Sequence, residues 1–149
     1  MNLPAAQRSW NLRLHPEQLA FAKLPPGSEV PDWARAARHP ITTVSWSQNE
    51  TSVLAPVAAV PSDVDRFGPW QAFEVEGHID FLLTGVLSGI IAPLASSQIA
   101  VTTLSTYQTD WILVPAEQAE QAVNVWRYHG HVVTVLPASD AAPSQEEQG

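Results

Sequence analysis

Residues 70–114 read WQAFEVEGHIDFLLTGVLSGIIAPLASSQIAVTTLSTYQTDWILV, and this stretch decides the fold. Its first residues alternate, with Phe73 and Val75 on one face, which is typical of a half-buried strand. Apolar residues then recur at helical spacing and predict an amphipathic helix over residues 84–96. Pro93 lies inside this helix, where it removes a backbone donor and predicts a kink or a loosened last turn.

The chain continues with a hairpin, a second helix and a last strand. Residues 99–106 and 111–114 are rich in β-forming residues and flank a polar turn, so they predict a β-hairpin. Pro115 can open the next helix, and Gly130 can act as its C-terminal stop. Residues 132–136 are nearly all apolar and predict a strand. The order βαββαβ predicts one antiparallel sheet with both helices on one face.

The composition favours neither nucleic acid nor a membrane as a partner. The 149 residues are 45% apolar and carry a formal net charge of −8. Only Arg35 and Arg38 lie close together, whereas a binder of nucleic acid or anionic lipid normally has a basic patch. Because the chain has no cysteine, disulfides, thiol catalysis and cysteine-bound zinc are excluded. The first residues lack the apolar core of a signal peptide, and no apolar run could span a bilayer, so we expect a cytoplasmic protein.

An internal echo at a spacing of 60 residues predicts a duplication. Residues 42–54 read TTVSWSQNETSVL, and residues 102–114 read TTLSTYQTDWILV, with four identical positions in an ungapped alignment. The predicted organisation is a degenerate first unit over residues 1–69, a second unit over residues 70–137 and a disordered acidic tail over residues 138–149.

The first unit has a weaker pattern than the second, because proline interrupts it. Its first crossover contains PPGSEVP, which leaves room only for a short helix. Pro69 marks the predicted boundary with the second unit. The predicted elements are strands over residues 10–14, 21–24, 41–47 and 51–54, and short helices over residues 32–37 and 61–65.

Several short motifs of the second unit occur together in one known family. They are Glu76-Gly77 at a strand end, Asp80-Phe81, Thr84-Gly85 at the helix start, Ala92-Pro93-Leu94, and Ser105-Thr106 with Asp110 before an apolar strand. As a group they resemble the ACT-domain proteins of the cytosolic arginine sensor type and their small bacterial relatives. They are more distantly similar to the regulatory ACT domains of aspartate kinase. The resemblance covers residues 70–136, and the N-terminal LRLHPEQLAFAKLPPGSEVPDWA is similar to the degenerate first unit of such proteins.

This resemblance implies a fold and a class of function. The implied fold is α+β, with two ferredoxin-like βαββαβ units whose antiparallel sheets carry helices on one face. The implied function is regulatory: an amino acid or related effector binds at an interface between ACT units, without cofactor and without catalysis. A homodimer and an unidentified regulated partner are implied as well. The alternative is a ligand-independent module for protein interaction or oligomerisation.

A free amino acid needs donors for its carboxylate and acceptors for its ammonium group. Backbone amides at the start of the first predicted helix can supply the donors, and Gly85 allows close approach, although it could equally serve only to ease the turn. Asp80 and Asp110 are candidate acceptors, or else a helix cap and a solvated turn residue. The resemblance adds Ser105 and Thr106. The predicted ligand-binding set is Gly77, His78, Ile79, Asp80, Thr84, Gly85, Val86, Ser105, Thr106 and Asp110.

Catalytic and metal sites are not predicted. His129 and His131 flank a glycine, but a metal site needs further ligands and the sequence around them supplies no third. Glu74 and Glu76 alternate along a strand and resemble an acid pair, yet a solvated strand face explains them better. The motifs GxSxG, P-loop and GxGxxG are absent from the sequence, so no nucleophile–base set can be assembled.

Overall fold

A seven-stranded sheet forms the centre of the protein, in the order β2-β3-β1-β4-β6-β5 with β7 paired to β1. The computed structural model describes residues 8–77 and 85–138. Its elements are β1 (Asn11–Leu24), α1 (Asp32–Ala36), β2 (Thr43–Trp46), β3 (Thr51–Pro56), β4 (Arg66–Val75), α2 (Val86–Ser96), β5 (Thr102–Ser105), β6 (Asp110–Pro115), α3 (Ala119–Tyr128) and β7 (Val132–Val135), with 3-10 turns η2 (Val57–Ala59) and η3 (Ala116–Gln118). Among the described residues, no helix combines the length and hydropathy needed to cross a bilayer.

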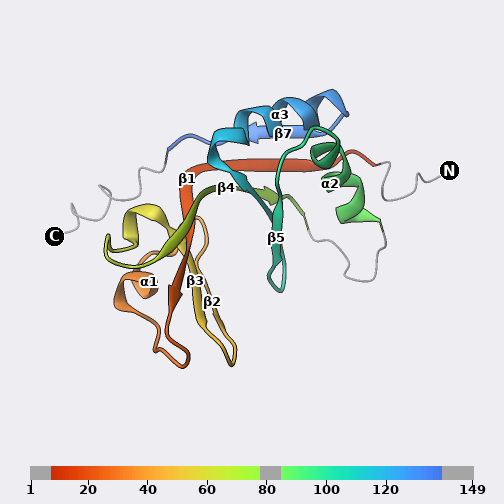
Figure 1. Ribbon diagram of the computed structural model, residues 1–149. Helices are drawn as coiled ribbons and strands as arrows, with labels where there is room; N and C mark the ends of the chain where they lie inside the picture. The colour runs from red at the N-terminus through yellow and green to blue at the C-terminus, as the bar shows by residue number, and fades with distance from the viewer. Residues whose placement is uncertain (1–7, 78–84, 139–149) are drawn as a thin grey trace.

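Strand β1 connects two parts of the sheet. Its first half pairs with β7 and the end of β4, and its second half pairs with β3 and the start of β4. Figure 1 shows the first half beneath α3 and the second half turning towards β2 and β3. The sequence predicts two separate strands, over residues 10–14 and 21–24, whereas one strand runs through both segments. Pro16 sits inside this strand where the register with β4 shifts, between Leu14 and Gln18, and such an interruption of the ladder tolerates a residue without a backbone donor.

The element order from β4 to β7 is the predicted βαββαβ, in an α+β fold with antiparallel pairing of β4, β5 and β6. Two features differ from a self-contained unit. Strand β7 pairs in parallel with β1, so β1 lies between β7 and β4. Pro69, the predicted boundary, lies within β4 rather than in a linker. The division of the chain into two units stays a prediction, because β1 and β4 contribute to both parts of the sheet.

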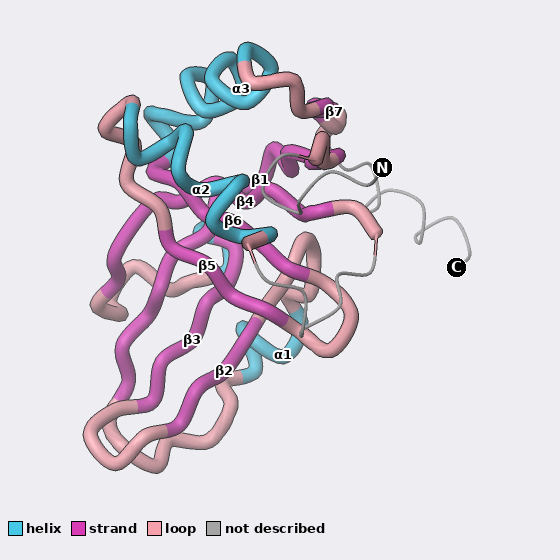
Figure 2. The backbone as a smooth tube through the Cα atoms, turned by 90° about the vertical axis from the view of Figure 1, so that its right-hand side faces the viewer, coloured by secondary structure: helices cyan, strands magenta, loops and turns pink. Residues whose placement is uncertain are grey.

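Helices α2 and α3 cover one face of this sheet (Figure 2). Ile90 and Leu94 of α2 and Trp126 of α3 are fully buried and share one core cluster with Phe73 and Ile112. Burying a side chain of this size stabilises the fold by roughly 1.5–3 kcal/mol. The Trp126 ring meets Phe73 edge-on, with centroids 4.7 Å apart, and its Nε1 donates a hydrogen bond to the Ile90 carbonyl at 2.7 Å. The tryptophan therefore fixes α3 against α2.

The two hairpins repeat each other, but in a register one residue shorter than the sequence echo. Thr43 pairs with Leu54, and Thr102 pairs with Leu113, so equivalent positions lie 59 residues apart rather than 60. Residues that match at a spacing of 60 in the sequence, such as Thr43 and Thr103, therefore do not occupy equivalent positions in the two hairpins. A 3-10 turn follows each hairpin directly. The helix predicted over residues 61–65 does not form, and η2 precedes that segment instead.

Candidate ligand pocket

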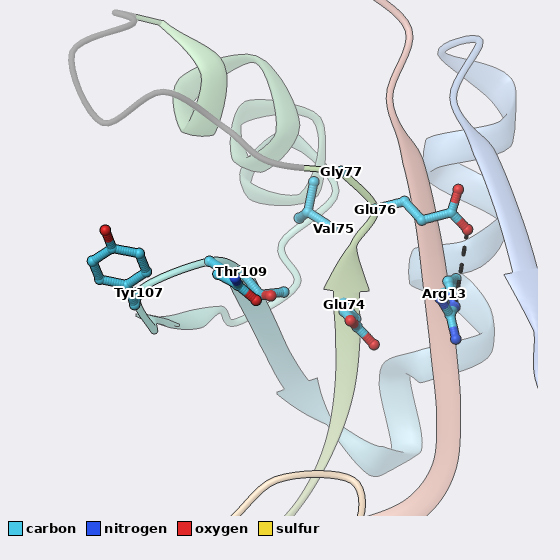
Figure 3. Close-up of a pocket in the computed structure, with 8 residues that line it drawn as sticks. Arg13, Glu74, Val75, Glu76, Gly77, Tyr107 and Thr109 are labelled. Atoms are coloured by element: carbon cyan, nitrogen blue, oxygen red, sulfur yellow. Dashed lines mark ion pairs between the residues drawn. The ribbon is translucent and has the colours of Figure 1, made fainter.

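A pocket of about 360 Å³ opens at the end of β4, beside the turn that joins β5 to β6. It draws its walls from both parts of the chain, because β1 contributes one residue and the segment after Trp70 contributes the others. Figure 3 shows this arrangement. The lining residues are Arg13, Glu74, Val75, Glu76, Gly77, Tyr107, Gln108 and Thr109.

Arg13 and Glu76 form an ion pair across one side of the pocket. Their Nε and Oε1 atoms are 3.9 Å apart, and their side chains are 39% and 46% exposed. A pair this long and this exposed contributes little to stability, roughly 0–1 kcal/mol. The guanidinium therefore keeps donors available for another anion, and its planar fork suits a carboxylate.

Glu74 is the less exposed carboxylate of the pocket. Strand alternation turns Glu74 to the face opposite α2 and α3, because its neighbours Phe73 and Val75 pack in the core beneath these helices. There its Oε1 lies 2.9 Å from Nε2 of His15, and its side chain is 24% exposed. The sequence predicts a solvated strand face for Glu74 and Glu76. The structure agrees for Glu76, whereas Glu74 is half-buried and paired.

The far wall is a closed turn. The Thr106 amide donates to the Thr109 carbonyl at 2.8 Å, and the Thr109 amide donates to the Thr106 hydroxyl at 3.1 Å. These bonds hold Tyr107 at the tip, with 86% of the residue exposed beside the pocket. A fixed turn that carries an exposed aromatic ring offers a flat apolar surface to the aliphatic part of a ligand.

The predicted ligand-binding residues are spread over several parts of the structure. Gly77 lines the pocket, with φ of 88° and open space where a Cβ would stand. Ser105, Thr106 and Asp110 lie at the base of the turn, where the Ser105 hydroxyl donates to the buried Asp110 carboxylate. Gly85 precedes α2 with φ of 81°. The other members of the set are Val86, whose side chain is buried in the core, and His78, Ile79, Asp80 and Thr84, which lie outside the described residues.

That these residues bind a ligand stays a prediction. Gly77 is the one described member that lines the pocket. The other seven lining residues were not predicted as ligand-binding: Arg13, Glu74, Val75, Glu76, Tyr107, Gln108 and Thr109. Tyr107 and Gln108 could have been found in the sequence, because they form the polar turn between the two hairpin strands.

The histidines at the end of α3 have a structural explanation. His131 is buried, and its Nδ1 accepts a hydrogen bond from the Trp10 amide at 3.0 Å. Burial lowers the pKa of His131 below its ordinary value, and the neighbouring His129 lowers it further. A neutral ring that accepts from the backbone serves to join the N-terminal segment to the start of β7.

Comparisons with known proteins support the fold. The family model of the ACT domain matches residues 68–127, so this part of the chain is similar to an ACT domain. A structure from Agobacterium tumefaciens superposes with a TM-score of 0.79 at 22% identity, covering 87% of this chain and 96% of that chain. A protein of unknown function from Vibrio cholerae gives 0.68 at 16% identity, covering 83% and 91%. The ligand-free regulatory subunit of aspartate kinase from Thermus thermophilus gives 0.52 at 10% identity, covering 80% and 97%. Curated protein sequences give no significant match.

Proposed function

We propose that the chain is a regulatory protein that senses an amino acid or a related small effector in the pocket at the end of β4. The observation that carries the proposal is the presence of both charges in one small pocket: the guanidinium of Arg13 and the carboxylates of Glu74 and Glu76. An amino acid presents the complementary pair. The volume of about 360 Å³ lies at the low end of the range for ligand sites, which suits a small metabolite.

Each part of the effector has a partner in this arrangement. Arg13 would hold the carboxylate with two parallel hydrogen bonds, and Glu76, released from its loose pair, would accept from the ammonium group. Tyr107 would cover the side chain. With two carboxylates against one guanidinium, the pocket favours an effector with an additional positive charge. This balance supports a basic amino acid such as arginine, in keeping with the resemblance to cytosolic arginine sensors.

The regulatory proposal extends to location and assembly. Because the pocket joins β1 to the second part of the chain, effector binding would tie the two parts together. We place the protein in the cytoplasm, as a homodimer that passes its signal to a separate partner and carries out no catalysis itself.

Thermal unfolding with each common amino acid tests the proposal. An effector present at 100 times its Kd adds about 2.7 kcal/mol to the unfolding free energy. Arg13→Gln removes the guanidinium that would bind the carboxylate of the effector, so it should abolish this stabilisation. Arg35→Gln changes a residue on α1 and outside the pocket, so it should retain the stabilisation. The proposal fails if no amino acid at millimolar concentration stabilises the protein, or if Arg13→Gln responds like the wild type.

One observation favours the alternative, a module for oligomerisation that needs no ligand. Strand β7 pairs with β1 on one side and with no other strand of the described residues on the other. Its Val132 and Val135 are 54% and 55% exposed, and an open strand edge with exposed valines is a template for pairing between chains. Light scattering with and without amino acids separates the two functions, because this alternative requires a stable oligomer that is indifferent to them.

A further inference from the structure

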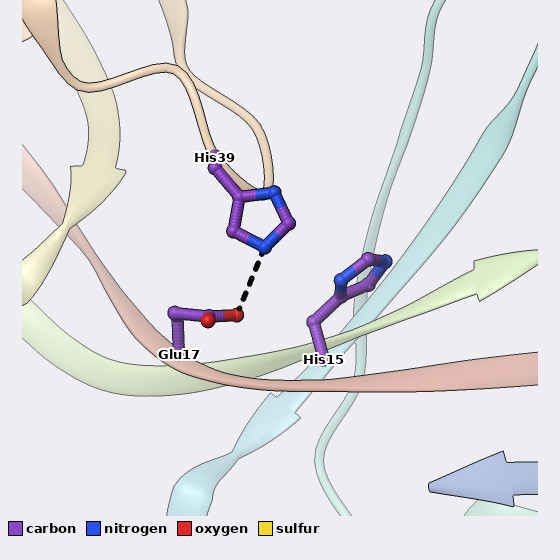
Figure 4. A group of neighbouring side chains, drawn as sticks. All are labelled: His15, Glu17 and His39. Atoms are coloured by element: carbon purple, nitrogen blue, oxygen red, sulfur yellow. Dashed lines mark ion pairs between the residues drawn. The ribbon is translucent and has the colours of Figure 1, made fainter. Parts of the chain in front are cut away.

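Two histidines and a glutamate meet outside the effector pocket, although they are not adjacent in the sequence. The candidate ligand atoms of His15, Glu17 and His39 all lie within 4.8 Å of one another. Figure 4 shows the three side chains converging on one point. We refer to them as the histidine cluster.

The fold explains why they converge. His15 and Glu17 lie two residues apart on β1, so they project to the same side of the strand. They occupy the segment between Leu14 and Gln18 where the register with β4 shifts. His39 reaches the same point from the loop between α1 and β2. No local motif in the sequence could show this, because the third side chain comes from a different part of the first unit.

The distances suit a metal ion. Oε1 of Glu17 and Nε2 of His39 are 3.4 Å apart. Two ligands that are each about 2.1 Å from a zinc ion at the tetrahedral angle are themselves about 3.4 Å apart. The ligand atoms of Glu17 and His39 are therefore already separated by the ligand-to-ligand distance of a tetrahedral zinc site.

His15 supplies the decisive observation. Its side chain is only 7% exposed, and its Nε2 lies 2.9 Å from the Glu74 carboxylate. A carboxylate accepts, so Nε2 carries a proton in this contact, and in the corresponding neutral tautomer the lone pair lies on Nδ1. Within the described part of the chain, this buried Nδ1 has no hydrogen-bond partner. A buried acceptor without a partner is costly, and Figure 4 shows it on the side of the ring that faces His39.

A histidine held in this way has the arrangement common among metal ligands. Such a histidine donates its other ring N–H to a carboxylate, which fixes the tautomer and the orientation of the ring. Here Glu74 fixes the tautomer, and the ring of Trp111, with its centroid 5.4 Å away, packs against the imidazole. The free nitrogen is thereby directed to the cluster before any ion arrives.

We propose that the histidine cluster binds a divalent transition-metal ion of the zinc type. Nδ1 of His15, Nε2 of His39 and the Glu17 carboxylate are the ligands, and water completes the shell through the open side at His39, whose side chain is 57% exposed. Two imidazoles with one carboxylate match zinc and its neighbours rather than magnesium or calcium, which take mainly oxygen ligands.

Calorimetric titration of the untagged, metal-free full chain with zinc chloride tests the proposal without any effector. We expect one equivalent to bind with a micromolar or lower Kd. His39→Ala, a change at an exposed loop, should raise this Kd at least tenfold, and so should Glu17→Gln. His129→Ala is the matched control, because it removes an exposed histidine away from the cluster and should leave the Kd unchanged.

Glu74 acts through His15 and is a positioning residue, so a second measurement follows its role. Glu74→Gln should weaken zinc binding by about 10–100-fold. The visible absorption spectrum of cobalt bound to this variant should nevertheless match that of cobalt bound to the wild type, because the three ligands are unchanged. The proposal is overturned if the wild type binds zinc no more tightly than His39→Ala does. It is overturned as well if His129→Ala abolishes zinc binding. It is also overturned if the cobalt spectrum is the same in His39→Ala as in the wild type.

Discussion

Replacing Trp126 with phenylalanine tests how α3 is held against α2. The indole is fully buried, and its Nε1 donates to the Ile90 carbonyl at 2.7 Å. The change removes this bond, worth about 0.5–1.5 kcal/mol, and two buried ring carbons, worth about 1.6 kcal/mol at 0.8 kcal/mol for each carbon group. We therefore expect the unfolding free energy to fall by about 2–3 kcal/mol, or more if the cavity does not relax.

Urea unfolding followed by tryptophan fluorescence measures this loss, and the melting temperature should fall by about 4–12 °C. Trp46→Phe is the matched control. Trp46 also donates from Nε1 to a backbone carbonyl, that of Ser28, at 2.8 Å, but it is 57% exposed. Water can replace that bond, so the control should cost no more than about 0.5 kcal/mol. Equal losses in the two variants would refute the role assigned to burial.

Two further changes test a titrating contact and a close backbone approach. Because burial lowers the pKa of His131, the unfolded chain binds a proton there more readily, and stability should fall as the pH drops below about 6.5. His131→Asn keeps an acceptor for the Trp10 amide but removes the titrating ring. Its unfolding free energy should therefore vary less than that of the wild type between about pH 7 and pH 5, and parallel pH profiles of the two proteins would contradict this. At Gly68, φ is 153° and an added Cβ would stand 3.0 Å from the Leu19 carbonyl oxygen. Gly68→Ala should therefore cost about 1–3 kcal/mol in urea unfolding, more than Gly27→Ala, where the added Cβ meets nothing.

Local patterns predicted the elements of the second half of the chain well. The stripe of α2, the hairpin, and the helix that ends before Gly130 all follow from spacing and turn chemistry within a few residues. Helix α2 runs through Pro93 to Ser96. Strand pairing was harder to predict, because the partner of β7 is set by the sheet as a whole. The first half of β1 already fills the place beside β4.

The pocket shows the same division between local and long-range information. The turn around Tyr107 and the strand end at Gly77 could be predicted because each follows from its own segment. Arg13 could not, because it comes to the pocket only through the pairing of Arg13 with Glu74 across β1 and β4. In the same way, nothing in the sequence indicated a metal site at His15 and His39. His15 lies on β1, and the fold brings His39 to it from the loop between α1 and β2.

Glu74 belongs to both proposed sites, and this has a thermodynamic consequence. Its carboxylate lines the effector pocket and also fixes the ring of His15. A metal ion on His15 would strengthen the hold of this ring on Glu74, which would leave the carboxylate less free to turn towards the additional positive charge of an effector. An effector that draws Glu74 away would in turn leave the tautomer of the His15 ring unfixed. Binding at the two sites is then coupled, and linkage requires the coupling to be reciprocal: whatever factor zinc applies to the effector Kd, the effector applies to the zinc Kd.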